Sequence, residues 1–157
     1  DIVPITLVRN EIDTVLYRAI EQKSGVTSHH CQRDRYGLLR AAECSLVASG
    51  TATLEAALCG RPFCVVYKTA PLTYLVARRL INLKMVGLAN IVAGKQVVPE
   101  YLQSDMNQEN LAGFCRQMLT NESSQQEMIS ALAKIRQRLG EPGAATRAAE
   151  MILSEFA

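Results

Sequence analysis

The sequence predicts an α/β protein built on a doubly wound parallel sheet and followed by helices. Up to about residue 100, short apolar runs alternate with stretches of helical periodicity, a pattern typical of parallel strands joined by helices. After that point the chain has few β-branched residues and reads as helix throughout. Its 157 residues, 48% of them apolar, suit one domain with a sizeable core.

The first part of the chain should contain four strands separated by helices. We expect strands at residues 2–8, 26–31, 45–48 and 63–67, and helices at residues 11–23, 34–42 and from about 51 to 60. Asp34 is expected to cap the second helix, and Gly60-Arg61-Pro62 should end the third. In the first helix one apolar face is predicted to point inward, formed by Ile12, Val15, Leu16 and Ile20.

Helices are also expected later in the chain, at residues 72–83, 107–119, 123–139 and 144–156. The first of these is apolar on most sides and carries Arg78 and Arg79. It lies in an interval between Glu55 and Glu100 that holds six basic and no acidic residues, which favours an anionic partner. The helix could lie at an anionic membrane surface, or it could be buried with its arginines reaching solvent.

The turn that follows the third strand is the strongest candidate for a binding site. Here Ala48-Ser49-Gly50-Thr51-Ala52-Thr53-Leu54-Glu55 runs from an apolar strand directly into a helix. Free amides and the positive end of the helix dipole favour an anion at such a place. Ser49, Thr51 and Thr53 add hydroxyl groups, Gly50 allows close approach, and Glu55 could reach a ribose. A nucleotide diphosphate fits this pattern.

The same pattern also fits a capped helix that binds nothing, because hydroxyl residues and an early acid stabilise helix starts by themselves. The turn matches neither the P-loop nor the G-x-G-x-x-G motif. A net charge of +2 argues against nucleic acid as a partner. The five cysteines lack metal-site spacing and are expected to be reduced, structural thiols of a cytosolic protein. His29 and His30 are expected at the surface rather than on a metal.

Several further blocks occur in a fixed order along the chain. They are Val66-Tyr67-Lys68, Pro71-Leu72-Thr73-Tyr74, Ala77-Arg78-Arg79-Leu80, Asn90-Ile91-Val92-Ala93-Gly94 and Val98-Pro99-Glu100-Tyr101-Leu102-Gln103. With the turn above, they closely resemble the C-terminal half of the lipid-A-disaccharide synthase family, which are glycosyltransferases of the two-Rossmann-domain GT-B class. The resemblance spans roughly residues 2 to 156.

The resemblance implies a reaction of lipid A, and hence lipopolysaccharide, biosynthesis. The family joins UDP-2,3-diacylglucosamine to 2,3-diacylglucosamine 1-phosphate and releases UDP. Carried over by motif, Ser49, Gly50, Thr51 and Thr53 would contact the diphosphate, and Glu55 the ribose hydroxyls. Asn90 would face the interdomain cleft near the sugar or phosphate, and the same cleft would include Tyr67, Lys68 and Gln103.

The resemblance also implies how the chain is organised. Residues 1–104 would be a Rossmann-like UDP-sugar-binding region that begins after its first strand, and residues 105–157 a helical segment packed on the same domain. The catalytic base would belong to an N-terminal half, so no catalytic residue, cofactor or metal is expected here, and the chain alone should be inactive. Arg78 and Arg79 would contact the cytoplasmic face of the bacterial inner membrane, where the enzyme would be peripheral. The protein could also form a homodimer, and the sequence does not decide this.

Two other functions remain compatible with the residues. One is a hydrolysing UDP-sugar 2-epimerase of similar fold, which would leave the basic, apolar segment at residues 72–83 unexplained. The other is a non-enzymatic module that binds a nucleotide or a lipid.

Overall fold

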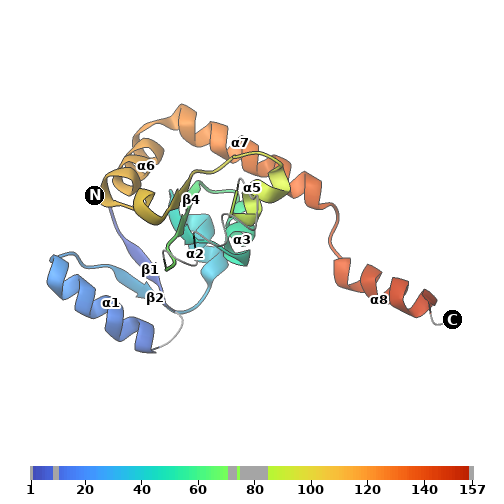
Figure 1. The fold of residues 1–157 in the computed structure, drawn as a ribbon, viewed down its shortest axis with the longest axis horizontal. Coiled ribbons are helices and arrows are strands. Elements are labelled where there is room, and N and C mark those ends of the chain that lie inside the picture. Colours follow the sequence, from blue (N-terminus) through green and yellow to red (C-terminus); the bar gives the residue numbers. More distant parts are fainter. Residues whose placement is uncertain (1, 9–10, 71–73, 75–84, 156–157) are drawn as a thin grey trace. The chain divides into compact units, whose positions relative to one another are not determined.

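The computed structural model shows an α/β protein and describes residues 2–8, 11–70, 74 and 85–155 (Figure 1). Its chain forms two compact units, Asp1–Ala42 and Glu43–Ala157. Each unit has its own sheet, and every strand pair within them is parallel. The predicted fold class is therefore confirmed, although the described strands form two small sheets instead of one.

The described residues of the first unit form two strands and two helices. They are β1 (Ile5–Leu7), α1 (Glu11–Ser24), β2 (His29–Cys31) and α2 (Arg35–Ala41). The predicted cap of α2 is confirmed, because Asp34 adopts a left-handed conformation and its carboxylate accepts a 2.9 Å hydrogen bond from the amide of Gly37. Such a bond satisfies one of the free amides at a helix start.

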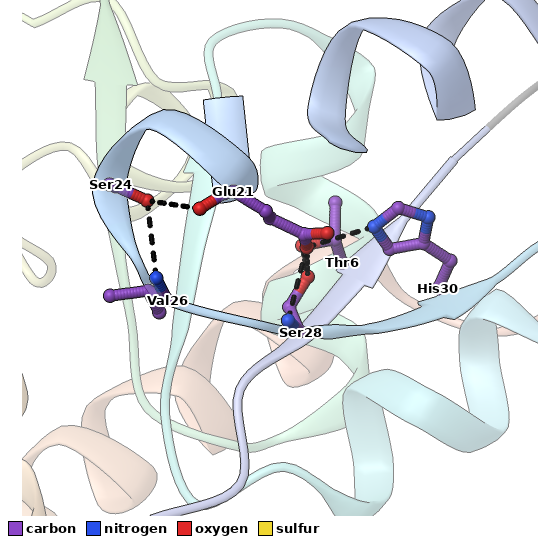
Figure 2. A network of polar contacts seen from close by, with 6 residues as sticks. All are labelled: Thr6, Glu21, Ser24, Val26, Ser28 and His30. Carbon is purple, nitrogen blue, oxygen red and sulfur yellow. Dashed lines mark hydrogen bonds and ion pairs between the residues drawn. The ribbon is translucent and has the colours of Figure 1, made fainter. Parts of the chain in front are cut away.

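A carboxylate fastens α1 to the sheet of the first unit (Figure 2). Oε1 of Glu21 accepts hydrogen bonds from the amide and hydroxyl of Ser28, at 3.0 and 2.5 Å, and lies 3.0 Å from Nε2 of His30. The Ser28 hydroxyl also contacts that of Thr6, 2.8 Å away in β1. His29 is exposed as expected, but the expectation is wrong for His30, whose side chain is only 13% exposed.

The apolar face of α1 is not buried as the sequence predicts. Val15, Leu16 and Ile20 are 68%, 59% and 52% exposed, and the side chain of Ile12 lies outside the described residues. A sheet of two three-residue strands offers too little surface to cover one face of a 14-residue helix. Hydrophobic periodicity therefore identified the helix correctly but not the burial of its face.

The second unit holds a three-stranded sheet in the order β3-β4-β5. Its elements are β3 (Ser45–Ala48), α3 (Thr51–Cys59), β4 (Phe63–Tyr67), α5 (Leu88–Ala93), β5 (Glu100–Leu102), a 3₁₀ turn (Gln103–Asp105), α6 (Gln108–Thr120), α7 (Glu122–Leu139) and α8 (Ala144–Glu155). The helix expected at residues 72–83, with Arg78 and Arg79, falls outside the described residues except for Tyr74. In the described ranges, no helix combines the length and the apolar character needed to cross a bilayer.

The core of the second unit is centred on β4. Phe63, Cys64 and Val65 are fully buried, as expected for a strand with a partner on each side. On one face, Cys64 packs with Phe114 and Met118 of α6. α7 contacts α3, α5 and α6, so it joins these three helices to one another.

The ends of the helices follow the sequence closely. Gly60 adopts the left-handed conformation that ends α3, with φ 71°, and Pro62 follows it as predicted. The side chains of Asn107 and Asn121 cap α6 and α7, each accepting a 3.0 Å hydrogen bond from an amide in the first turn. α8 is exposed along its whole length.

Three of the five cysteines pack together in the core of the second unit. All five are free thiols, and Cys44 and Cys115 pack around the buried Cys64. Burial raises the pKa of both Cys44 and Cys64 to about 12. These two thiols are therefore protonated at neutral pH and are poor nucleophiles.

The Glu21 network predicts an acid-sensitive first unit. Hydrogen bonds from Ser28 and then from His30 lower the pKa of Glu21 below its ordinary 4.5. A lowered carboxyl pKa gives stability that is fully present above pH 4.5 and is lost as the pH falls through the lowered value. In the wild type, the protection of β1 and β2 against amide hydrogen exchange should decrease as the pH falls, which reports this loss of stability. In Glu21→Gln the decrease with pH should be smaller. Glu127→Gln, which changes an exposed carboxyl of α7, is the control. Equal acid dependence in Glu21→Gln and the wild type would contradict the assignment.

Candidate functional site

The carboxyl ends of β3, β4 and β5 lie at one edge of the sheet. The register pairs Ala48 with Val66 and Tyr67 with Leu102, so all three strands end at neighbouring positions. A hydrogen bond closes the edge between β4 and β5, since the amide of Thr69 donates to Oε1 of Gln103 over 3.2 Å. In parallel α/β sheets ligands bind beyond the carboxyl ends of the strands. This edge is therefore the candidate site.

The turn between β3 and α3 is fixed by two hydrogen bonds from Ser49. Its amide donates to the carbonyl of Val66 over 3.0 Å, and its hydroxyl to the carbonyl of Val86 over 3.3 Å. The turn is thereby held against β4 and against the segment that leads into α5. Ser49 is half-buried, whereas Gly50 and Thr51 are exposed at the edge.

Gly50 sets the direction in which α3 leaves the sheet. Its φ of 137° and ψ of −162° belong to a region that only glycine adopts readily. A Cβ atom here would meet no atom within 4 Å, so the backbone angle, not crowding, requires glycine. The amides of Thr51 and Ala52 follow directly and, as the first of the helix, have no intrahelical acceptor, whereas the amide of Thr53 donates to the carbonyl of Gly50. They give the edge a partial positive charge.

Thr53 supports the turn from inside. It is fully buried, and its hydroxyl donates a 2.8 Å hydrogen bond to the carbonyl of Gly50. In this conformation its side chain does not reach the edge, contrary to the prediction that it offers a hydroxyl to the ligand. The pattern of small hydroxyl residues could not separate an exposed threonine from a buried one, because both suit a helix start.

The other predicted residues of the edge differ in exposure. Glu55 is half-buried and lies four residues after Thr51, hence on the same face of α3. Tyr67 and Lys68, at the end of β4, are exposed. Gln103 has a positive φ of 52°, and its amide nitrogen is shielded from solvent with no acceptor among the described residues.

Asn90 does not face a cleft. It is fully buried in α5, and its side-chain nitrogen donates to the carbonyl of Val98 and to Oε1 of Glu100, at 2.9 and 2.7 Å. Its oxygen accepts from the amides of Val97 and Val98, at 2.8 and 3.0 Å. These four bonds use the full hydrogen-bonding capacity of the side chain. The prediction that Asn90 faces the sugar or phosphate is corrected, since no polar atom is left for a ligand.

Glu100, which is half-buried, completes the network around Asn90, and sequence reasoning gave it no role. Besides the bond from Asn90, its carboxylate accepts hydrogen bonds from the amides of Val86 and Gly87, both at 2.9 Å. Gly87 leaves room for the carboxylate, because a Cβ atom there would lie 3.1 Å from Oε1 of Glu100 and 2.9 Å from Val65. No local motif predicts this partnership, since the partners of Glu100 lie 10 to 14 residues away.

Together, the fold and this edge define an α/β protein with parallel strands, in which the ends of three strands and the start of α3 meet. Residues 3–156 match the family model described as lipid-A-disaccharide synthetase. The chain belongs to this family, as its resemblance predicts.

Relatives with established names agree with the family match. The lipid-A-disaccharide synthase of Myxococcus xanthus (strain DK1622) is 44% identical over 130 residues, which cover 83% of this chain and 34% of that protein. The synthase of Anaeromyxobacter dehalogenans (strain 2CP-1) is 46% identical over 113 residues, or 72% of this chain and 30% of the relative. That of Acidobacterium capsulatum is 41% identical over 110 residues, or 70% and 28%. The chain thus spans about a third of the length of the curated relatives it matches.

Replacing Gly50 should strain the turn. Gly50→Ala forces a side chain into a region of backbone angles that costs about 1–3 kcal/mol, and chemical denaturation should show that loss in the free energy of unfolding. Gly113→Ala is the matched control, since Gly113 lies inside α6 with open space around it and alanine there should stabilise by up to about 1 kcal/mol. Equal effects of the two substitutions would contradict this account of Gly50.

Removing the Asn90 side chain should be more costly. Asn90→Ala leaves the amides of Val97 and Val98 without an acceptor and removes one of the hydrogen bonds that Glu100 accepts. It also opens a small cavity. We expect a loss of about 2–4 kcal/mol in the free energy of unfolding. Asn110→Ala, which removes one surface hydrogen bond to Asp105, should cost less than about 1 kcal/mol. A loss for Asn90→Ala no larger than this control would show that the network is dispensable.

Proposed function

We propose that this chain is the part of a lipid A glycosyltransferase that binds the donor nucleotide. The whole enzyme would join UDP-2,3-diacylglucosamine to 2,3-diacylglucosamine 1-phosphate, giving lipid A disaccharide and UDP. The family match and the names of the relatives support this reaction. The observation that carries the proposal is the glycine turn at the start of α3, on the carboxyl edge of three parallel strands.

The residues of the edge have distinct roles in the proposal. Ser49, Gly50 and Thr51 contact the diphosphate, and Glu55 accepts hydrogen bonds from the ribose hydroxyls. The remaining groups at the edge are Tyr67, Lys68 and Gln103. Thr53 and Asn90 are assigned to the support of the site, because both side chains are buried and hydrogen-bonded within the protein.

The chemistry of the edge suits a diphosphate leaving group. Negative charge develops on UDP as the bond to the donor sugar breaks. Amides at the start of α3 and the hydroxyl of Thr51 would stabilise that charge in place, without the reorganisation that water requires. Lys68 adds a positive charge at the same edge. The groups named here bind and stabilise the leaving group but do not activate the acceptor hydroxyl.

We assign the general base to the part of the enzyme outside this chain, so the isolated chain should have no transferase activity. Residues 1–104 would serve the UDP-sugar, with residues 105–157 packed as helical support. Arg78 and Arg79 are proposed to contact the anionic cytoplasmic face of the inner membrane, which would make the enzyme peripheral. The basic interval of the sequence supports this contact, although both arginines lie outside the described residues.

A titration with UDP tests the nucleotide site directly. Addition of UDP to the ¹⁵N-labelled chain should shift the amide signals of residues 49–52, 68, 69 and 103, whereas uridine, which lacks the diphosphate, should shift them far less. Glu55→Ala should weaken UDP binding about ten-fold or more, the value of a hydrogen bond to a charged group. The matched control is Glu43→Ala, which changes an exposed carboxylate before the opposite end of β3.

Two outcomes would overturn the assignment. Shifts confined to other segments of the spectrum would place the nucleotide elsewhere. Equal UDP affinity in Glu55→Ala and Glu43→Ala would remove Glu55 from the ribose. The spectrum of each variant also reports whether it is folded, so a lost interaction can be told from a lost structure.

A further inference from the structure

A groove of about 520 Å³ lies between α7 and the segment that leaves α5. Its floor is apolar and includes Val97, Ala131 and Ile135, whereas Lys95, Lys134 and Arg138 supply positive charge. None of the predicted residues of the nucleotide edge lines it. The groove is therefore a separate feature of the second unit.

The groove is built on one face of α7. Ala131, Lys134, Ile135 and Arg138 follow the i, i+3, i+4, i+7 spacing that places side chains on a single helix face. Lys134 and Arg138 are thus neighbours of like charge, an arrangement that by itself slightly destabilises a helix. Arg138 has a structural reason to be here, because its guanidinium donates to the carbonyls of Val92 and Ala93 at the end of α5.

Lys95 and Lys134, unlike Arg138, make no hydrogen bond within the described residues that explains their position in the groove. Both are exposed, and within the described part of the chain neither is paired with a carboxylate. No Asp or Glu of the described residues lines the groove. Two uncompensated ammonium groups above an apolar floor are complementary to a molecule that is both anionic and apolar. A free anion would leave the apolar floor exposed to water.

We propose that this groove binds an anionic phospholipid, with its phosphate at Lys95 and Lys134 and the first part of its acyl chains on the floor formed by Val97 and Ala131. The groove would then hold the second unit against an anionic membrane surface. This inference does not depend on the proposed transferase activity, and Lys95→Gln/Lys134→Gln should leave the UDP titration unchanged.

Vesicle co-sedimentation tests the proposal. The 157-residue chain should bind phosphatidylcholine vesicles that contain phosphatidylglycerol, and bind pure phosphatidylcholine vesicles far less. Each lysine removed near an anionic surface should weaken binding about five-fold, so Lys95→Gln/Lys134→Gln should lose about 25-fold. The matched control is Arg116→Gln/Arg136→Gln, which removes the same charge from exposed positions outside the groove and should lose less than about two-fold.

A second measurement locates the lipid on the protein. Short-chain phosphatidylglycerol, kept monomeric, should shift the amide signals of Val97 and Ala131, whereas glycerol 3-phosphate at equal concentration should not. Equal losses in the two double variants would show attraction by net charge alone and overturn the proposal. Shifts of equal size with glycerol 3-phosphate would identify an anion site without a lipid role. Binding of polyglutamate, without binding of vesicles, would assign the groove to an acidic protein instead.

Discussion

The carboxylate of Glu100 is the contact on which the candidate site most depends. It holds the amides of Val86 and Gly87 and the side chain of Asn90 at the start of β5. Val86 in turn presents its carbonyl to the hydroxyl of Ser49. Through these steps one half-buried acid connects β5 and α5 to the turn that begins α3. Buried polar networks of this kind specify a unique arrangement when every member is satisfied.

Two polar residues near the turn direct their side chains into the protein and not toward the edge. Thr53 and Asn90 are fully buried. The side chain of Thr53 hydrogen-bonds to the backbone, and that of Asn90 hydrogen-bonds to the backbone and to Glu100. They support the edge from inside, while Gly50 and Thr51 are exposed there and are the groups that we propose to contact the diphosphate. A preorganised anion site needs both kinds of residue, since donors that must first be ordered contribute less to binding.

The sequence could predict what depends on neighbours along the chain. The cap at Asp34, the helix end at Gly60, the turn at Gly50 and the long helices each follow from local rules. It did not predict β5 or α5, because these segments of three and six residues lie in no longer run with a clear strand or helix period. The burial of Asn90 could not be predicted either, since it is decided by contacts with Val97, Val98 and Glu100. The prediction that the apolar face of α1 is buried was wrong for the same reason, because the burial of a helix face depends on the surface that packs against it.

The conformation of Gly50 has a consequence for anyone who wishes to redesign the ligand preference of this edge. The residue at the apex of the turn carries no side chain, and its backbone angles exclude almost every replacement. Within the turn itself, changes to the proposed ligand contacts are therefore best made at the flanking hydroxyl positions, Ser49 and Thr51. Of these, Thr51 is the freer choice, because Ser49 is already engaged with the carbonyl of Val86.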